Sequence, residues 1–247
     1  MLPVVLVAAI IATGAQAKAP AALTGKTWLL TSLNGINRQA LGITAVFTTG
    51  GKLSGFSGCN SYGGTYTTSG SSISIPDRLA VTQVACRQAV MAQESAYLEA
   101  LTSATNYSVR NGILTLAGRK SRTVLRFRAQ SQSLAGTRWD VIEYNNGKEA
   151  VVSVMAGTKL TANFTATDVE GSAGCNTYGG KYTATPPKIT IGPLASTRKE
   201  CPTPEGVMEQ EHAFLAALTS AATYKIQGAT LELRTASGAL AATLHRA

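Results

Sequence analysis

The sequence predicts an α+β protein of two repeated small domains, each an antiparallel, partly barrel-like β-sheet packed with one α-helix. Two observations support this fold class. A nine-residue motif with a cysteine at its second position occurs twice, and segments of strand, helix and strand character follow it each time in the same order. The composition is that of a globular chain with many turns, because 45% of the 247 residues are hydrophobic, 14% are charged and 24 are glycine.

The repeat is clearest around the first and third cysteines. Gly-Cys-Asn-Ser-Tyr-Gly-Gly-Thr-Tyr at 58–66 recurs as Gly-Cys-Asn-Thr-Tyr-Gly-Gly-Lys-Tyr at 174–182. Residues on either side match in the same order, including Trp28 with Trp139, Phe47 with Phe164, Cys86 with Cys201 and Leu101 with Leu218. We therefore place copy 1 at 24–128 and copy 2 at 134–247, joined by a polar segment near 129–133.

The first half of each copy is predicted to consist of strands. An opening strand buries a tryptophan, at 28–30 in copy 1 and 139–142 in copy 2, and a second strand follows at 45–48 and 159–164. The paired glycines of the repeated motif are expected to form a tight corner, because glycine adopts backbone angles that other residues avoid.

After the second cysteine of each copy, the spacing of apolar residues predicts one amphipathic helix. The residues at helical spacing are Val90, Glu94, Tyr97, Leu98 and Leu101 in copy 1, and Met208, Glu211, Phe214, Leu215 and Leu218 in copy 2. In copy 2 we expect Thr203 to cap the helix and Pro204 to take its first position. Alternating segments at 113–116, 123–127, 230–233 and 240–244 predict the closing strands.

The N-terminus is typical of a secretory signal peptide, which we place at 1–17. An apolar run from Leu2 to Ala12 precedes Ala15-Gln16-Ala17, an A-x-A cleavage site. We expect a mature chain that begins at Lys18 and is soluble in the periplasm. It is expected to lack a transmembrane segment, because the apolar run is too short to span a bilayer, and to lack a lipid-anchor cysteine.

The four cysteines, Cys59, Cys86, Cys175 and Cys201, favour disulfides, because an even number in an exported chain is typical of a disulfide framework. Three connectivities are possible, and pairing within each copy is the simplest. No C-x-x-C pair is present, and His212 and His245 do not have the spacing of zinc ligands. We expect no metal and no cofactor.

No pattern in the chain predicts catalysis. A serine nucleophile needs a base, yet both histidines lie in copy 2, and the glycines form neither a P-loop nor a dinucleotide motif. Asn60 and Asn176 could bind a ligand, but local hydrogen bonds to their own turns are the favoured interpretation. Four tyrosines could line a pocket but are interpreted as core residues; they are Tyr62, Tyr66, Tyr178 and Tyr182.

Charge is distributed unevenly between the copies. Residues 18–129 contain 12 basic and 3 acidic residues, whereas 130–247 contain 10 of each, so copy 1 carries the whole net charge of +9. A candidate site for anionic surfaces consists of Arg119, Lys120, Arg122, Arg126 and Arg128, of which the last three share one face of an alternating strand. The alternative is an edge strand kept soluble by its charge.

These residues resemble the META domain family, to which the bacterial heat-shock protein HslJ belongs. The resemblance rests on the early tryptophan, the Gly-Cys-Asn-x-Tyr-Gly-Gly-x-Tyr segment, the Leu-Ala-x-Thr approach to the second cysteine and the short helix. It implies an envelope location, a link to heat shock, stress response or drug tolerance, a fold similar to lipid-binding pilot proteins, and no established reaction. The chain departs from HslJ in being doubled and in lacking the anchor cysteine.

Three functions remain open at this point. The first is a non-enzymatic periplasmic binding module for anionic lipid, lipopolysaccharide or an acidic envelope protein, in which each helix and sheet enclose an apolar groove. The second is a secreted inhibitor of a periplasmic or foreign hydrolase, and the third is a structural spacer. Nucleic acid is not an expected partner after export.

Overall fold

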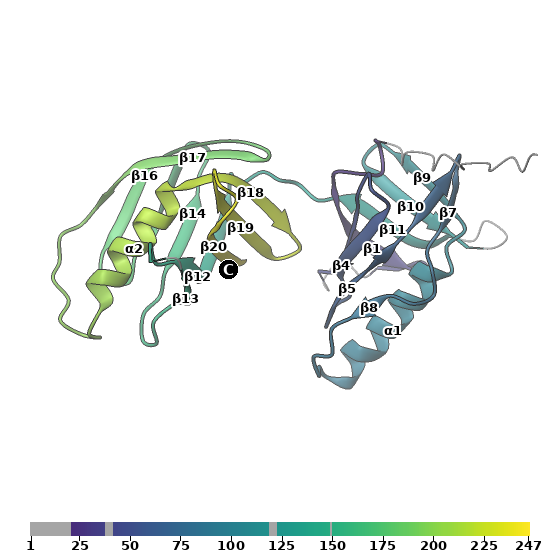
Figure 1. Ribbon diagram of the computed structural model, residues 1–247, viewed down its shortest axis with the longest axis horizontal. Helices are drawn as coiled ribbons and strands as arrows, with labels where there is room; N and C mark the ends of the chain where they lie inside the picture. The colour runs from purple at the N-terminus through teal and green to yellow at the C-terminus, as the bar shows by residue number, and fades with distance from the viewer. Residues whose placement is uncertain (1–20, 38–41, 119–122, 149) are drawn as a thin grey trace, which may run out of the picture. The chain divides into compact units, whose positions relative to one another are not determined.

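The computed structural model describes residues 21–37, 42–118, 123–148 and 150–247, so the expected signal peptide lies outside the described residues. The chain divides into two compact units, one built mainly from copy 1 and the other containing all of copy 2. Each unit is a β-sheet with one helix (Figure 1), and every strand pair whose register is defined is antiparallel. The predicted α+β class with two repeated domains is therefore confirmed.

Copy 2 forms a closed barrel. Its strands are β12 (Thr137–Asn145), β13 (Val151–Ser153), β14 (Thr161–Phe164), β15 (Asp168–Ser172), β16 (Thr177–Thr185), β17 (Lys188–Ser196), β18 (Ala221–Gln227), β19 (Thr230–Thr235) and β20 (Leu240–Arg246). The ring closes because β12 pairs with both β14 and β20. At this closure Trp139 faces Arg246 across the strands, and the guanidinium carbon lies 4.5 Å from the centroid of the indole ring, a cation–π contact.

Copy 1 has strands and one helix in the same order, but its sheet does not close and forms a half-barrel. Its strands are β1 (Thr27–Leu33), β2 (Ile36–Asn37), β3 (Thr44–Phe47), β4 (Lys52–Phe56), β5 (Ser61–Thr65), β6 (Thr67–Ser69), β7 (Ser72–Ser74), β8 (Ala80–Val81), β9 (Asn106–Arg110), β10 (Ile113–Ala117) and β11 (Thr123–Ala129). They follow the order β6-β7-β9-β10-β11-β1-β3-β4-β5-β8, with β2 paired to β1.

The break between β7 and β8 lies where the two copies differ in sequence. Three residues separate Ile75 from Leu79, whereas two separate Ile191 from Leu194, the matching pair in copy 2. The extra residue coincides with the break, whereas a proline by itself does not cause one, because Pro193 lies within the continuous strand β17 of copy 2. The long hairpin of β16 and β17 is replaced in copy 1 by two short hairpin pieces.

One helix follows the second cysteine of each copy, as the spacing predicts. These are α1 (Gln88–Thr102) and α2 (Val207–Thr219), and α2 packs against β12, β17 and β20. The expected cap in copy 2 is wrong, because α2 begins after Gly206, whose φ of 88° is left-handed, and no side chain caps it. Pro204 lies before the helix, where its carbonyl accepts a hydrogen bond from Val207 N at 3.2 Å. No helix among the described residues is long and apolar enough to cross a membrane.

Equivalent aromatic residues form the core of both copies. Trp28 and Trp139 are fully buried in their opening strands. A T-shaped ring pair occurs at the same place in each copy, with centroids 4.9 Å apart for Phe47 and Tyr66 and 5.0 Å apart in the matching pair. Edge-to-face geometry of this kind adds stability beyond the buried area. Burial of all four motif tyrosines confirms that they are core residues.

The paired glycines of the motif do not form the expected corner. Gly64 and Gly180 lie within strands β5 and β16, and the left-handed backbone belongs instead to Gly58 and Gly174, with φ of 107° and 106°. At the second glycine of each pair a side chain would meet a close neighbour, whereas the first glycine, Gly63 or Gly179, has room for one. A Cβ on Gly64 would lie 2.5 Å from the Leu79 side chain, and one on Gly180 would lie 2.5 Å from the backbone oxygen of Pro193.

We predict that Gly180→Ala destabilises copy 2 more than Gly64→Ala destabilises copy 1. The expected losses are about 2 kcal/mol and under about 1 kcal/mol, because the end of the Leu79 side chain can rotate away whereas the backbone oxygen of Pro193 cannot. Urea unfolding monitored by hydrogen-exchange mass spectrometry measures the free energy of unfolding of each copy separately, because each peptide belongs to one copy. Equal losses in the two copies would contradict the steric explanation.

Candidate functional site

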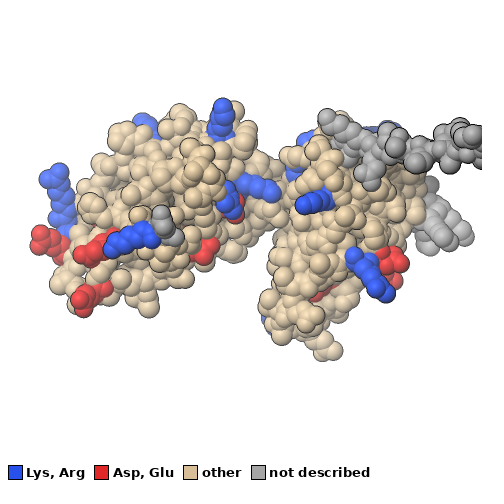
Figure 2. Space-filling model, viewed as in Figure 1, with Lys and Arg blue, Asp and Glu red and all other residues tan. Residues whose placement is uncertain are grey.

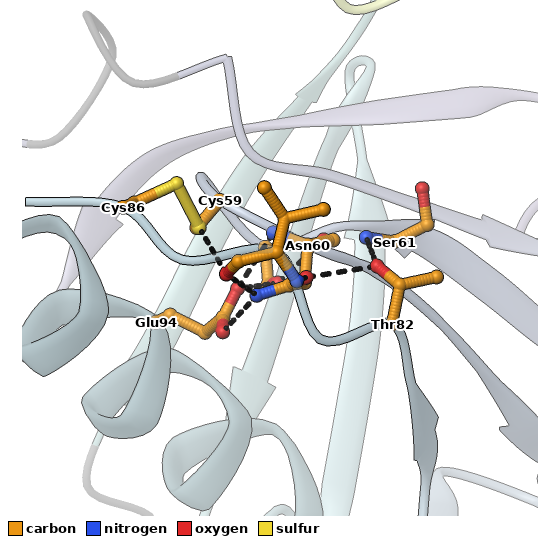
Figure 3. Close-up of a disulfide and its surroundings, with 8 residues drawn as sticks. Cys59, Asn60, Ser61, Thr82, Cys86 and Glu94 are labelled. Carbon is orange, nitrogen blue, oxygen red and sulfur yellow. Dashed lines mark hydrogen bonds between the residues drawn. A yellow bond between two sulfur atoms is a disulfide. The ribbon is translucent and has the colours of Figure 1, made fainter.

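The corner beside the first disulfide is built around the buried side chain of Asn60. Cys59 is bonded to Cys86, and Glu94 reaches this corner from α1 (Figure 3). The carboxylate of Glu94 accepts hydrogen bonds from Asn60 N at 2.8 Å and from Asn60 Nδ2 at 2.9 Å. The hydroxyl of Ser57 donates a third hydrogen bond to this carboxylate. We call the pair Asn60 and Glu94, with its equivalent in copy 2, the Asn–Glu clamp.

Asn60 also holds the loop that leads into the helix. Its Oδ1 accepts hydrogen bonds from Val84 N at 2.7 Å and from the hydroxyl of Thr82 at 2.9 Å. One side chain therefore joins the motif corner, the loop before α1 and the helix itself. This differs from the expected hydrogen bond within its own turn, because the partners lie more than 20 residues along the chain.

Copy 2 repeats the clamp with one change. Asn176 donates from its backbone N and its Nδ2 to Glu211, at 2.9 and 3.1 Å, and its Oδ1 accepts from Thr197 Oγ1 and Lys199 N. The disulfide between Cys175 and Cys201 lies beside it, so both disulfides are within copies. Ala173 occupies the position of Ser57, so the third donor to the carboxylate is missing.

The carboxylate of the first clamp has a perturbed pKa. Burial by itself raises the pKa of Glu94, but the hydrogen bonds donated by Ser57 and by the side chain and backbone of Asn60 outweigh burial and lower the pKa below its ordinary value. The Glu94 side chain is only 8% exposed, and because its pKa is lowered it is charged inside the fold at neutral pH. A buried charge is tolerated only when it is fully hydrogen-bonded, which the clamp achieves.

The motif tyrosines contribute buried hydroxyls rather than a pocket. The hydroxyls of Tyr62 and Tyr97 lie 2.7 Å apart, and burial raises the pKa of both phenols. In copy 2 Phe214 replaces Tyr97, and Tyr178 donates instead to the carbonyl of Thr161 at 2.8 Å. Each phenol therefore has a partner and stays neutral at physiological pH.

The candidate basic stripe is only partly described. Arg126 is exposed on β11 between the fully buried Leu125 and Phe127, which confirms the predicted alternation, and Arg128 on the same strand is half-buried. Its Nε is buried without a hydrogen-bond partner. The other three members of the stripe lie outside the described residues; they are Arg119, Lys120 and Arg122.

A hollow of about 540 Å³ lies in copy 2, where the start of α2 meets β12 and β13. Met155, Val152 and Ala213 provide apolar lining, and Lys148 and His212 provide polar groups. Beneath it Gln210 is buried and accepts a hydrogen bond from Met155 N at 2.7 Å. This hollow borders the start of α2, and the apolar groove expected between the helix and the sheet of each copy stays a prediction.

The histidines are exposed, and the cysteines are bonded to one another in pairs. His212 and His245 are exposed on α2 and β20, and all four cysteines are in disulfides. Among the described residues, no group of three or more His, Cys, Asp or Glu side chains is arranged to hold a metal.

The residues that the sequence reasoning missed are the two clamp glutamates. Their spacing predicts that Glu94 and Glu211 lie on the amphipathic helices, but it does not connect them with Asn60 and Asn176. The available signal was a carboxylate at the same place among apolar residues in both copies, where a charged side chain needs partners.

We predict that Glu94→Gln loosens α1 at neutral pH and has little effect in acid. The lowered pKa means that this group stabilises the fold above its unfolded value of about 4.5, and that the contribution is lost as the pH falls through the folded pKa. At pH 7 the expected loss is about 2 kcal/mol, because Gln cannot accept all three hydrogen bonds.

Hydrogen exchange of α1 peptides at pH 7 and pH 3 measures this effect, and α2 peptides of the same samples serve as the reference. A Glu94→Gln variant with equal loosening of α1 at both pH values would show that charge on the clamp is unimportant.

A family model for the META domain matches residues 21–131 and again 132–247. Among solved structures, an NMR structure of a protein from Burkholderia xenovorans is 25% identical, with a TM-score of 0.39, over 46% of this chain and 83% of its own. A DUF4847 family protein from Bacteroides vulgatus ATCC 8482 is 16% identical, with a TM-score of 0.35, over 45% of this chain and 96% of its own. No curated protein matches. Because the two matches of the family model cover all but the first 20 residues, the chain belongs to the META domain family and carries two tandem META domains.

Proposed function

We propose that this protein is a non-enzymatic, exported binding module that attaches to anionic components of the cell envelope through copy 1. Two disulfides support the export, since such bonds persist in oxidising compartments such as the bacterial periplasm. The family resemblance supports a setting in envelope stress or drug tolerance. The residues of copy 1 support the anionic target.

The observation that carries the proposal is the uncompensated positive charge on copy 1. Of its three acidic residues, Glu94 is buried in the clamp, which leaves Asp77 and Glu99 exposed. Its described part exposes six basic residues, namely Lys26, Lys52, Arg78, Arg87, Arg110 and Arg126. Figure 2 shows the two signs side by side over copy 2, where surface ion pairs such as Lys159 with Asp140 at 3.1 Å bring them together. Excess charge of one sign attracts and steers a partner of the opposite sign.

Several of the basic residues are held on rigid strands of the half-barrel. Arg110 ends β9 and Arg126 lies on β11, and both strands flank β10. Both side chains are exposed, whereas Leu114 and Leu116 of β10 are fully buried on the core face. Cations on the outer face of a sheet can reach headgroup phosphates without any rearrangement of the core.

We predict that removing positive charge from copy 1 weakens binding to anionic vesicles far more than removing it from copy 2. The test variant Arg78→Gln, Arg110→Gln, Arg126→Gln changes three exposed residues of copy 1. The control variant removes the same number of exposed charges from copy 2 by Arg138→Gln, Lys188→Gln, Lys225→Gln. Cosedimentation with phosphatidylglycerol vesicles at low salt is the measurement.

Each basic residue near an anionic surface contributes about 1 kcal/mol, so the copy 1 variant should lose at least about tenfold in affinity and the control less than about threefold. Screening by salt should remove the difference. Equal losses from the two variants would disprove the assignment to copy 1, and absence of binding by the wild-type chain would disprove the proposed function.

A further inference from the structure

We propose that copy 1 inserts an apolar tip, formed by Val84 and Met91 with Arg87 between them in the chain, into an anionic phospholipid bilayer. This inference rests on the proposed function and names the partner of copy 1. Val84 is 57% exposed in the loop before α1, and Met91 is 44% exposed in the first turn of the helix. Large apolar side chains in such exposed positions leave favourable burial unused.

The chemistry around the tip suits a phosphate-rich surface. From Leu79 to Gln93 the chain contains no acidic residue, and Arg87 is its only charge. Arg87 is exposed, and its planar guanidinium can bind phosphate oxygens with two hydrogen bonds while its stem lies along apolar surface. Binding at a bilayer interface grows with both the buried apolar area and the attraction to anionic lipid.

The tip is held rigidly before any partner arrives. Asn60 fixes the backbone of Val84 on both sides, by accepting from its N–H at 2.7 Å and donating to its carbonyl oxygen at 3.3 Å. Two residues further on, Cys86 is joined to Cys59 by the disulfide. Glu94, one helical turn after Met91, is held by the same asparagine. Because the fold already holds this backbone in place, insertion costs little further conformational entropy.

Copy 2 holds the same backbone but presents different side chains. Lys199 replaces Val84 and makes the same hydrogen bond to its asparagine, from its N–H to Asn176 Oδ1 at 2.8 Å. The following segment contains three acidic residues where copy 1 has none; they are Glu200, Glu205 and Glu209. Burying such charges in lipid is costly. Met208 of copy 2 matches Met91, so the tip of copy 1 differs from copy 2 by Val84 and by the absence of acidic residues, and the scaffold requires neither.

A bilayer fits the tip better than a protein partner does. A stable protein interface buries about 800 Å² on each side, and two exposed apolar side chains supply only a small part of that area. A bilayer needs no matching shape, and its anionic headgroups also attract the remaining positive charge of copy 1. The bilayer is therefore the partner to which we commit.

Tryptophan placed at the tip tests insertion directly. Trp28 and Trp139 are both fully buried, so a new tryptophan at 84 provides the solvent-sensitive signal. With phosphatidylglycerol vesicles, the emission of Val84→Trp should shift to shorter wavelength and be quenched when the acyl chains are brominated. The control is Ile142→Trp in copy 2, where Ile142 is 51% exposed, and its emission should not change.

A charge-adding substitution separates insertion from electrostatic attachment. Val84→Lys installs the residue of copy 2 and raises the positive charge, so attachment by charge alone predicts binding equal to or tighter than the wild type. Insertion predicts binding about tenfold weaker at moderate salt, because the buried valine is lost. Val84→Ser should weaken binding in the same direction.

The possible outcomes are distinguishable. If the wild-type chain does not bind the vesicles, both the proposed function and the insertion fail. If it binds, but Val84→Trp is not quenched and Val84→Lys binds at least as tightly, electrostatic attachment stands and insertion is overturned. A tryptophan response to lipopolysaccharide or to an acidic protein, without one to phosphatidylglycerol vesicles, overturns the bilayer as the partner.

Discussion

The structure of each copy depends on one buried carboxylate that bonds to one asparagine. Glu94 and Glu211 project from the helices into the corner of the sheet, where Asn60 and Asn176 donate through both backbone and side chain. A carboxylate buried without these donors would cost several kcal/mol, so the helix can dock only where the asparagine is in place. The docked helix then brings its aromatic residue, Tyr97 or Phe214, into the core.

The disulfide and the clamp act on the same corner by different means. The clamp fixes the native geometry through directed hydrogen bonds, whereas each disulfide closes a loop of 27 or 26 residues and removes freedom from the unfolded chain. Loop closure of this length stabilises a domain by about 3 to 4 kcal/mol on the chain-entropy estimate. Together they create a loop whose backbone is nearly independent of the side chains that it presents.

That independence allows two copies of one fold to present different surfaces. Lys199 and Val84 occupy the same place on the same scaffold, yet one is charged and the other apolar. Copy 2 closes its barrel and balances its charges, whereas copy 1 leaves its sheet open and keeps a large positive excess. The two copies thus share the clamp and the core but differ in their surfaces.

The sequence by itself determined the domain plan. The duplicated motif, the buried tryptophan of each opening strand and the change from strand to helical spacing predict two α+β units, and the separation of the cysteines favours pairing within each unit. These features could be predicted because they are local or periodic, and burial along a strand or helix leaves a regular pattern in the chain. The charge difference between the copies is likewise a property of composition.

Only the tertiary structure decided which groups meet. Asn60 and Glu94 lie 34 residues apart, and no spacing rule connects them. The sequence does not predict several strands, among them β4, β9, β15 and β18. Which of their residues are buried depends on neighbouring strands, and those neighbours are decided only when the sheet assembles. Gly180 is required by the close backbone oxygen of Pro193 rather than by its own backbone angle, and Gly206 rather than Thr203 precedes α2. In each case the deciding contact is long-range or steric, and a contact of that kind exists only after the chain has folded.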